Sequence, residues 1–579
     1  MAVIYLVSIA GLFFLVVMGR KSPERQNVLV WSVLGAFLTL CAQVLAGGIL
    51  DILGIGITLV SMSVANLLFC GACVVWICRK GWQAGYLSLT DLAGVAVILY
   101  VIWKLAADRY GSALTTINFV SVDAAVHAGL AKGVALTGRL TLGRYFAALV
   151  TGMAMEIYRN LAGAGFLLYR GYIFSEVMFT AFSALLLWAA LRDRMKTGKL
   201  KALVPTAIAL IYWIGYPAYA TLFGFSYFSV SICVLTALLF LLSRYIREED
   251  EKLPVVVMLN LALLGVIVSY TLFVPAAFFG AFATVALEMW KKDRKKIVSW
   301  KNIRTMLAIF LIPTALGLYF NIQDLQELSP DTGAITVDGG CYSDLYSNFI
   351  LLIPFTALGL YFLVRKKESR YLLPVFLVQL LFTGYLFIKA MDGQVSAYYY
   401  MKNNSLLWML CWLSVGEALL YMMDRNKAAL LFMLYFGAFL YMGFTGDALV
   451  EEKNPRFISV GSGGQFHVMH FNDEFYREGD ATMIHPEKMD LYRYVDEHCT
   501  GETTVSVGKE TENAWFRNLT GQDQLFTYGS RDDLARQVEE CGARYICVTY
   551  TDPYAVCCDY INSFDSVYEN GQGKIVQIP

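Results

Sequence analysis

The chain has 579 residues, of which 57% are hydrophobic and only 16% are charged, and its formal net charge at pH 7 is zero. A soluble globular protein of this length does not have that balance, so the composition predicts a polytopic membrane protein. The neutral net charge gives no indication of a nucleic-acid partner.

Apolar stretches of about 20 residues, the length that crosses a bilayer as a helix, recur along most of the chain. We expect about 14 such helices. The first one has neither a basic leader nor a small-residue cleavage site, so it is interpreted as a retained helix and not as a signal peptide. The expected spans are residues 2–19, 27–47, 54–78, 87–105, 172–191, 203–220, 224–243, 254–271, 273–290, 304–321, 346–364, 371–389, 405–423 and 428–446.

Lysine and arginine gather in every second loop between these spans, which predicts that those loops are cytoplasmic. The opposite loops are poor in basic residues, apart from the long one after the fourth span. Residues 321–348, for example, include Asp and Glu but neither Lys nor Arg. The alternation predicts a multi-pass protein of the plasma membrane, with both termini and everything after about residue 447 outside the cytoplasm.

Two domains are expected. Residues 1–446 form the transmembrane domain, and the polar segment 447–579 forms a small extracytoplasmic α/β domain. The elements expected in the second domain are helices over residues 488–498 and 531–541, strands over 503–507 and 544–549, and a closing hairpin whose turn is Asn570-Gly571.

The segment from about residue 106 to 171 follows the fourth expected span and forms the first large external loop. It is too long for a simple connection and too apolar for a linker. We expect two amphipathic helices at the membrane interface, over residues 124–136 and 146–157. Arginine presents a fork of donors that suits phosphate oxygens. The basic residues on this side of the membrane are Lys104, Arg109, Lys132, Arg139, Arg144, Arg159 and Arg170.

Asp123 and His127 lie near the start of that loop. They are four residues apart, which places them on one face of a helix. Two interpretations stay open. In the first, Asp123 accepts a proton inside a cleft lined by Arg and Lys that faces the lipid. In the second, the loop is an interfacial hairpin whose cations contact lipid head groups and whose Asp and His form a structural pair.

A second external stretch, residues 394–404, holds three consecutive tyrosines followed by Lys402. Such a group could bind a phosphate and the face of a sugar, and an aromatic belt with a snorkelling lysine explains it equally well. Glu176 lies just inside the fifth expected span, where an ionisable residue indicates a function unless it snorkels outward.

Metal ligands are sparse. The acidic loop with Asp324, Glu327, Asp338 and Asp344 could hold a divalent cation, although its irregular spacing favours a solvated loop. The pair His467 and His470 lacks a third ligand at a suitable spacing and is interpreted as surface histidines. No cofactor is required by the sequence, and a divalent cation stays open. Asn518-Leu519-Thr520 matches a glycosylation sequon, a short pattern that is frequent by chance.

The chain resembles the GT-C superfamily, the integral-membrane glycosyltransferases that use polyprenyl-phosphate-linked sugars, and within it poorly characterised bacterial members. The resemblance covers the many helices, the external loop with its acidic residue, and the external α/β domain. In the superfamily this loop usually follows the first helix, whereas here it follows the fourth. The motifs that carry the likeness are residues 123–138 (Asp, His and Thr-Gly), Tyr399-Tyr400-Met401-Lys402 and residues 564–571.

The resemblance implies an inverting glycosyltransferase of the hexosyltransferase type, which moves a sugar from a polyprenyl-phosphate donor to a glycan, lipid or protein acceptor outside the cytoplasm. Asp123 would be the general base, and His127 would orient it or share its proton. Only Asp108 and Glu156 are available as a second acid. The residues implied to bind the donor phosphate and the substrate are Arg139, Arg144, Arg159, Lys402, Tyr399 and Tyr400.

Two other function classes stay open. One is a transporter or flippase for a lipid-linked glycan, because the number of helices also suits that class. The other is a polysaccharide polymerase or a noncatalytic assembly protein. An ion-coupled transporter usually carries several ionisable residues deep within its helices, and here few acidic residues lie within the expected spans: Asp91, Glu176, Glu288 and Glu417.

Overall fold

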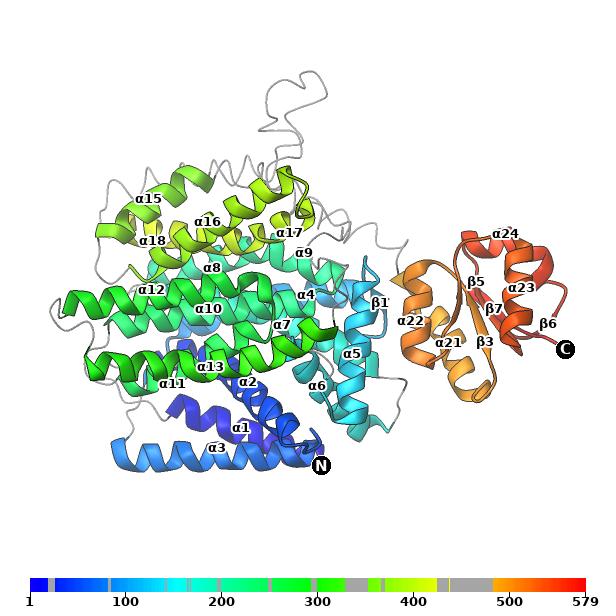
Figure 1. The fold of residues 1–579 in the computed structure, drawn as a ribbon, viewed down its shortest axis with the longest axis horizontal. Helices are drawn as coiled ribbons and strands as arrows, with labels where there is room; N and C mark the ends of the chain where they lie inside the picture. Colours follow the sequence, from blue (N-terminus) through cyan, green and yellow to red (C-terminus); the bar gives the residue numbers. More distant parts are fainter. Residues whose placement is uncertain are drawn as a thin grey trace, which may run out of the picture.

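The structure is a computed structural model of the chain. It is mostly helical, with a small α/β unit at the C-terminal end, and Figure 1 shows this unit beside one end of the helix bundle. The residues that it describes are 1–18, 27–81, 85–140, 143–163, 166, 168–194, 199–247, 252–292, 299–327, 352–365, 370–423, 437 and 483–579.

Ten helical segments in the described part are long and apolar enough to cross a membrane. Their helices are α2 (Val28–Ile52), α3 (Leu59–Lys80), α4 (Leu89–Tyr110), α7 (Leu168–Arg192), α8 (Lys199–Ile214) with α9 (Tyr216–Phe223), α10 (Ser226–Arg247), η2 (Thr271–Phe273) with α12 (Val274–Lys292), α13 (Trp300–Glu327), α16 (Leu372–Met391), and α17 (Ala397–Lys402) with α18 (Asn404–Met423).

The expected number of spans was about 14, and the difference has a simple origin. Three further apolar helices coincide with expected spans but are shorter: α1 (Ala2–Met18), α11 (Lys252–Ile267) and α15 (Leu352–Arg365) have 17, 16 and 14 residues. The last expected span, 428–446, lies outside the described residues apart from residue 437. Hydropathy therefore located the apolar helices, and the count of complete crossings stays a prediction.

Two helices fill the segment between α4 and α7, as expected. They are α5 (Asp123–Thr137) and α6 (Phe146–Ala162), and they pack closely against each other. Gly152 makes the close packing possible, because a Cβ on it would lie 2.8 Å from the Ala131 carbonyl oxygen. Figure 1 shows both helices at the end of the bundle that faces the α/β unit.

The start of α5 rests against the turn between α9 and α10. The Val120 N–H donates to the Leu222 carbonyl oxygen at 2.9 Å. Gly224, at the C-terminus of α9, has a φ of +68°, in the left-handed region that favours glycine. A Cβ on Gly224 would lie 2.5 Å from the Cβ of Ala124, so the turn and α5 touch backbone to backbone. This contact fixes the depth at which α5 begins.

The α/β unit carries a five-stranded sheet in the order β4-β3-β5-β7-β6, in which β3 is parallel to β4 and β5, and β7 is antiparallel to β5 and β6. The expected helices and strands of this segment are present, and the structure adds α22, β4 and α24. The elements are α21 (Pro486–His498), β3 (Thr504–Val507), α22 (Glu510–Thr520), β4 (Gln524–Phe526), α23 (Arg531–Cys541), β5 (Tyr545–Thr549), α24 (Asp552–Ile561), β6 (Asp565–Asn570) and β7 (Gly573–Gln577).

The α/β unit contacts the membrane part through backbone and side chains. The two-residue strand β1 (Ile117–Asn118) pairs antiparallel with β2 (Met483–Ile484). One hydrophobic cluster also spans both parts and includes Phe119 and Trp515. Because β1 comes just before α5, the chain around Asp123 is held from both the bundle and the α/β unit.

Candidate functional site

Asp123 is the first residue of α5 and is half-buried. Its N–H donates to the Ser121 hydroxyl oxygen at 3.1 Å, a local turn of the kind that favours a helix start. A carboxylate in the first turn also interacts favourably with the positive end of the helix dipole. The sequence at this point therefore holds a carboxylate at a fixed position at the beginning of a helix.

His127 lies one turn further along α5 and packs its imidazole edge-on against the ring of Tyr227, with 4.5 Å between the ring centroids. In the part of the chain that the structure describes, the buried Nε2 atom of His127 has no hydrogen-bond partner. A buried ring nitrogen without a partner is costly, because water no longer solvates it. A bound molecule could therefore form a hydrogen bond with this nitrogen atom, either as donor or as acceptor.

Lys402, the last residue of α17, lies within an aromatic cage. Its ammonium nitrogen is 4.1 Å from the ring centroid of Tyr398, 4.6 Å from that of Phe225, 5.6 Å from that of Tyr227 and 5.7 Å from that of Tyr270. The Lys402 Nζ also donates to the Tyr227 hydroxyl at 3.2 Å. Cation–π contacts of this kind stabilise a positive charge away from bulk water.

Charges couple Asp123, His127 and Lys402. Burial raises the pKa of Asp123 above its ordinary value, against the opposing effects of the Lys402 charge and a hydrogen bond with Ser121. Burial, together with the charges of Lys402 and Arg144, lowers the pKa of His127 to about 3. The site therefore combines a carboxyl group with a raised pKa, an imidazole that is neutral at pH 7 and a caged cation, and His127 is a weak base there.

The predicted site residues separate into two groups. Asp123, His127 and Lys402 come together, and the charge of Arg144, an exposed residue just before α6, reaches His127. Tyr399 is next to the cage, with its ring 5.1 Å from that of Tyr398. Residues more than 200 positions apart in the chain thus meet at the beginning of α5.

Three other predicted residues face elsewhere. Arg139 is exposed and donates to the Gly54 carbonyl oxygen at 2.8 Å, at the turn between α2 and α3. Arg159 is exposed and forms an ion pair with the mostly buried Glu156 at 2.7 Å. Tyr400 packs against Phe387, with 5.2 Å between the ring centroids.

The two alternative acids are both paired with a cation. Asp108 forms an ion pair with Lys104 at 2.6 Å, and both side chains are more than half exposed. Glu156 is engaged by Arg159 as described above. Asp123 is thus the carboxylate that the structure brings to the caged lysine.

Of the four aromatic residues of the cage, Tyr398 belongs to the predicted run of tyrosines, whereas Phe225, Tyr227 and Tyr270 were not predicted. Tyr398 had a signal in the sequence, because it precedes Lys402 by four residues, a spacing that places both on one face of a helix. Tyr400 precedes Lys402 by only two residues and so points to another face. The other three rings come from α10, from the residue just before it and from the connection between α11 and η2. Only the packing of the helices brings them to Lys402.

Glu176 lies in the third turn of α7 and is fully buried, so it does not snorkel outward. Its carboxylate interacts with the hydroxyl of Ser226 at the start of α10. Its backbone carbonyl oxygen accepts a hydrogen bond from the Thr180 hydroxyl at 2.7 Å. An ionisable group of this kind within an apolar helix is typical of a functional position.

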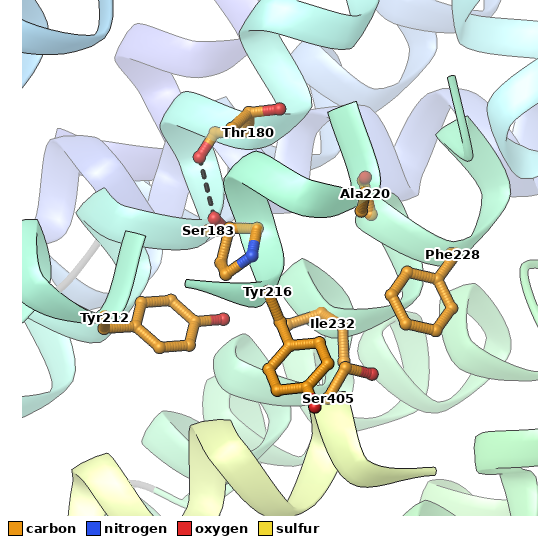
Figure 2. Close-up of a pocket in the computed structure, with 10 residues that line it drawn as sticks. Thr180, Ser183, Tyr212, Tyr216, Ala220, Phe228, Ile232 and Ser405 are labelled. Carbon is orange, nitrogen blue, oxygen red and sulfur yellow. Dashed lines mark hydrogen bonds between the residues drawn. The ribbon is translucent and has the colours of Figure 1, made fainter. Parts of the chain in front are cut away.

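Two connected hollows extend from the cage into the bundle. Figure 2 shows the deeper one, where the side chains of Tyr212, Tyr216 and Ser405 surround the same space as Thr180 and Ser183. Both hollows are small, with space of the order that holds one or two water molecules. The outer hollow shares Tyr216, Phe228 and Ser405 with the deeper one and is completed by Tyr219, Phe225, Tyr398, Met401 and Lys402.

Among the described residues, no three His, Cys, Asp or Glu side chains gather in a metal-binding arrangement. Of the acidic loop, Asp338 and Asp344 lie outside the described residues, as do His467 and His470. The side chains of Asp324 and Glu327 are not described either.

Comparisons with known proteins found similar solved structures but no matching family or curated protein. Among solved structures, the chain is similar to ArnT from Cupriavidus metallidurans, in a crystal structure with undecaprenyl phosphate bound. The TM-score is 0.46 and the identity 12%, over 84% of this chain and 97% of the ArnT chain. At this TM-score and identity the likeness transfers neither an activity nor a residue role to the chain.

Proposed function

We propose that the protein is a membrane glycosyltransferase that moves a sugar, of the hexose type, from a polyprenyl-phosphate donor to an extracytoplasmic acceptor. One observation carries the proposal: a half-buried carboxylate and a caged lysine meet at one end of a bundle of apolar helices. A general base and a fixed positive charge are the two groups that this transfer needs. The neighbouring tyrosine rings and hydroxyls suit a sugar, and the apolar helices suit a lipid tail.

The chemistry proceeds as a single displacement. Asp123 takes the proton of an acceptor hydroxyl while that oxygen forms a bond to the anomeric carbon of the sugar. The bond between the anomeric carbon and the phosphate oxygen breaks on the opposite side, so the configuration inverts. The polyprenyl phosphate leaves with the bonding electron pair, and the positive charges of Lys402 and Arg144 stabilise it.

His127 has a different role from the one implied by the resemblance. With a pKa of about 3 its imidazole is neutral, so it does not carry the transferred proton at neutral pH. Its buried Nε2 atom is available to hydrogen-bond the sugar or the acceptor. Arg139 and Arg159 keep a role in contacts with lipid head groups, since both are exposed on the loop that carries α5 and α6.

We infer the orientation from the alternation of basic loops. Residues 1–446 form the transmembrane domain, with 106–171 as its large external loop, and residues 447–579 form the extracytoplasmic domain. Both termini lie outside the cytoplasm, in a multi-pass protein of the plasma membrane. The acceptor is a glycan, a lipid or a protein that is present on that side.

A second candidate function is a transporter or flippase for lipid-linked glycans. Glu176 favours it, because a buried carboxylate within a membrane helix is typical of ion-coupled carriers. The α/β unit that packs onto α5 favours the transferase, since a carrier has no evident use for it.

The experiment that tests the transferase is the substitution Asp123→Asn in the purified protein, reconstituted with polyprenyl-phosphate-linked sugars. Asn keeps the size and the helix start but cannot accept the proton, so kcat falls by about 10²- to 10⁴-fold. The matched control is Asp108→Asn, an exposed carboxylate on the same side of the membrane, which keeps the wild-type rate. Equal transfer by Asp123→Asn and the wild type would refute the assignment of the base.

A further inference from the structure

Helix α22 of the α/β unit lies directly against α5, the helix that begins with Asp123 (Figure 1). The contact is made by hydrogen bonds through one residue, Asn518. Its side-chain Nδ2 donates to the Ala125 carbonyl oxygen at 2.8 Å. The backbone carbonyl oxygen of Asn518 accepts a hydrogen bond from Nζ of Lys132 at 2.6 Å. Asn518 therefore connects two points on α5, on either side of His127.

Gly129 makes this close approach possible. A Cβ on Gly129 would lie 3.2 Å from Nδ2 of Asn518, which is closer than ordinary van der Waals contact. The lack of a side chain at this position lets the asparagine reach the backbone of α5. Ala125, the residue whose carbonyl oxygen is bound, is only two positions after Asp123.

Trp515 fixes the chain on the other side of Asp123. It is fully buried, and its ring stacks on that of Phe119 with 6.0 Å between the centroids. It also meets the ring of Tyr172 edge-on at 6.0 Å. Trp515 precedes Asn518 by three residues, so both lie on the face of α22 that contacts the membrane part. Phe119 before Asp123 and Ala125 after it are thus held by the same helix.

The charge on Lys132 belongs to this contact and not to the site around Lys402. Burial lowers the pKa of Lys132, and the carboxylate of Asp496 on α21 opposes the effect. Lys132 therefore receives its partners from two helices of the α/β unit. The sequon residue Asn518 has a structural use here, because its side-chain amide is already bound to α5.

We propose that the α/β unit positions the site: Asn518, Trp515 and Lys132 hold the beginning of α5, and so determine where the Asp123 carboxylate lies relative to Lys402. Asn518 is a positioning residue, since it acts through α5 and does not meet the substrate. The expected effect on the transfer rate rests on the proposed function. The expected effect on α5 rests on the contacts alone.

The test compares Asn518→Ala with Asn562→Ala. Asn562 also accepts hydrogen bonds inside the α/β unit, from Tyr554 and Lys574, but does not touch α5. We expect Asn518→Ala to lower kcat by about 10- to 100-fold, because a displacement of about 1 Å can cost that much. KM for the donor stays unchanged, and the acid limb of the pH–rate profile moves up as Asp123 leaves the influence of Lys402. Asn562→Ala leaves both kcat and the acid limb of the pH–rate profile unchanged.

A second readout does not depend on activity. Hydrogen exchange of the α5 amides, followed by mass spectrometry, reports whether Asn518 holds the helix. We expect faster exchange over residues 123–130 in Asn518→Ala, and also in Lys132→Met, which removes the other half of the contact. Unchanged exchange in both variants would overturn the inference, even if the wild type transfers sugar. If the wild type transfers no sugar and exchange still rises, only the proposed function fails.

Discussion

The substitution Gly224→Ala tests how closely the helix that carries Asp123 is fitted to the bundle. Gly224 ends α9 with a φ of +68°, and the space at its Cα is closed by α5. An added Cβ would lie 2.5 Å from the Ala124 Cβ, 2.9 Å from the Tyr172 hydroxyl oxygen and 3.0 Å from the Ala124 Cα. Because the new methyl group would meet three atoms at once, no change in a single side-chain rotamer can make room for it.

The expected cost has two parts. A left-handed conformation costs an alanine about 1–2 kcal/mol, and overpacking a close contact costs about 1–3 kcal/mol more. Carbon atoms pack best at about 3.5–4.0 Å, so α5 must move by about 1 Å to accommodate the methyl group. We therefore expect Gly224→Ala to lose about 2–5 kcal/mol of stability. A shift of about 1 Å at Asp123 also lowers the transfer rate about 100-fold.

The matched control is Gly163→Ala. Gly163 ends α6 with the same φ of +68°, but nothing lies within 4 Å of the added Cβ. It isolates the conformational cost, about 1–2 kcal/mol, and leaves the rate unchanged. The assay is the thermal unfolding of both purified variants, together with sugar transfer. Equal losses of stability, with equal rates, would show that α5 is not fitted to the turn and would refute the reasoning.

Substitutions at two further positions probe the charges of the site. Lys402→Met should lower kcat by about 10²- to 10³-fold, the usual effect of removing one group that stabilises developing charge. It should also move the acid limb of the pH–rate profile to higher pH, because the Lys402 charge lowers the pKa of Asp123. Lys402→Arg keeps the charge and should leave the acid limb in place. An unmoved acid limb in Lys402→Met would contradict the interaction between Lys402 and Asp123. His127→Phe should reduce the loss of stability between pH 6.5 and about 3. The unfolded chain takes up a proton in that window and the folded chain does not, so His127 lowers stability as the pH falls. The comparison comes from unfolding measured at pH 7 and at about pH 5. A pH dependence that is the same in His127→Phe and the wild type would contradict a neutral, buried His127.

Much of the fold was visible in the sequence because its signals are local. Apolar stretches located the helices of the bundle, and turn residues such as Asn570-Gly571 located the hairpin of β6 and β7. Elements without such a signal were missed. The strand β4 has three residues, and α22 buries its apolar residues within an otherwise polar sequence. The helices α1, α11 and α15 are so short that hydropathy alone does not decide whether they cross the membrane.

The site was predicted in part for the same reason. Asp123 and His127 are recognisable because they lie on one turn of one helix, and Lys402 because it follows a run of tyrosines. The cage around Lys402 was not predictable, since Phe225, Tyr227 and Tyr270 come from distant segments. The bond from Asn518 to α5 joins residues almost 400 positions apart, and a sequon gave no indication of it.

The most direct test of sugar transfer is the fate of the polyprenyl phosphate. Purified protein in liposomes would be given a polyprenyl-phosphate-linked sugar and an acceptor, and the lipid products measured by mass spectrometry. We expect free polyprenyl phosphate to appear in step with the glycosylated acceptor in the wild type, and not in Asp123→Asn. If the intact lipid-linked sugar instead crosses the bilayer without loss of its sugar, the protein is a carrier, and the assignment of Asp123 as a general base is wrong.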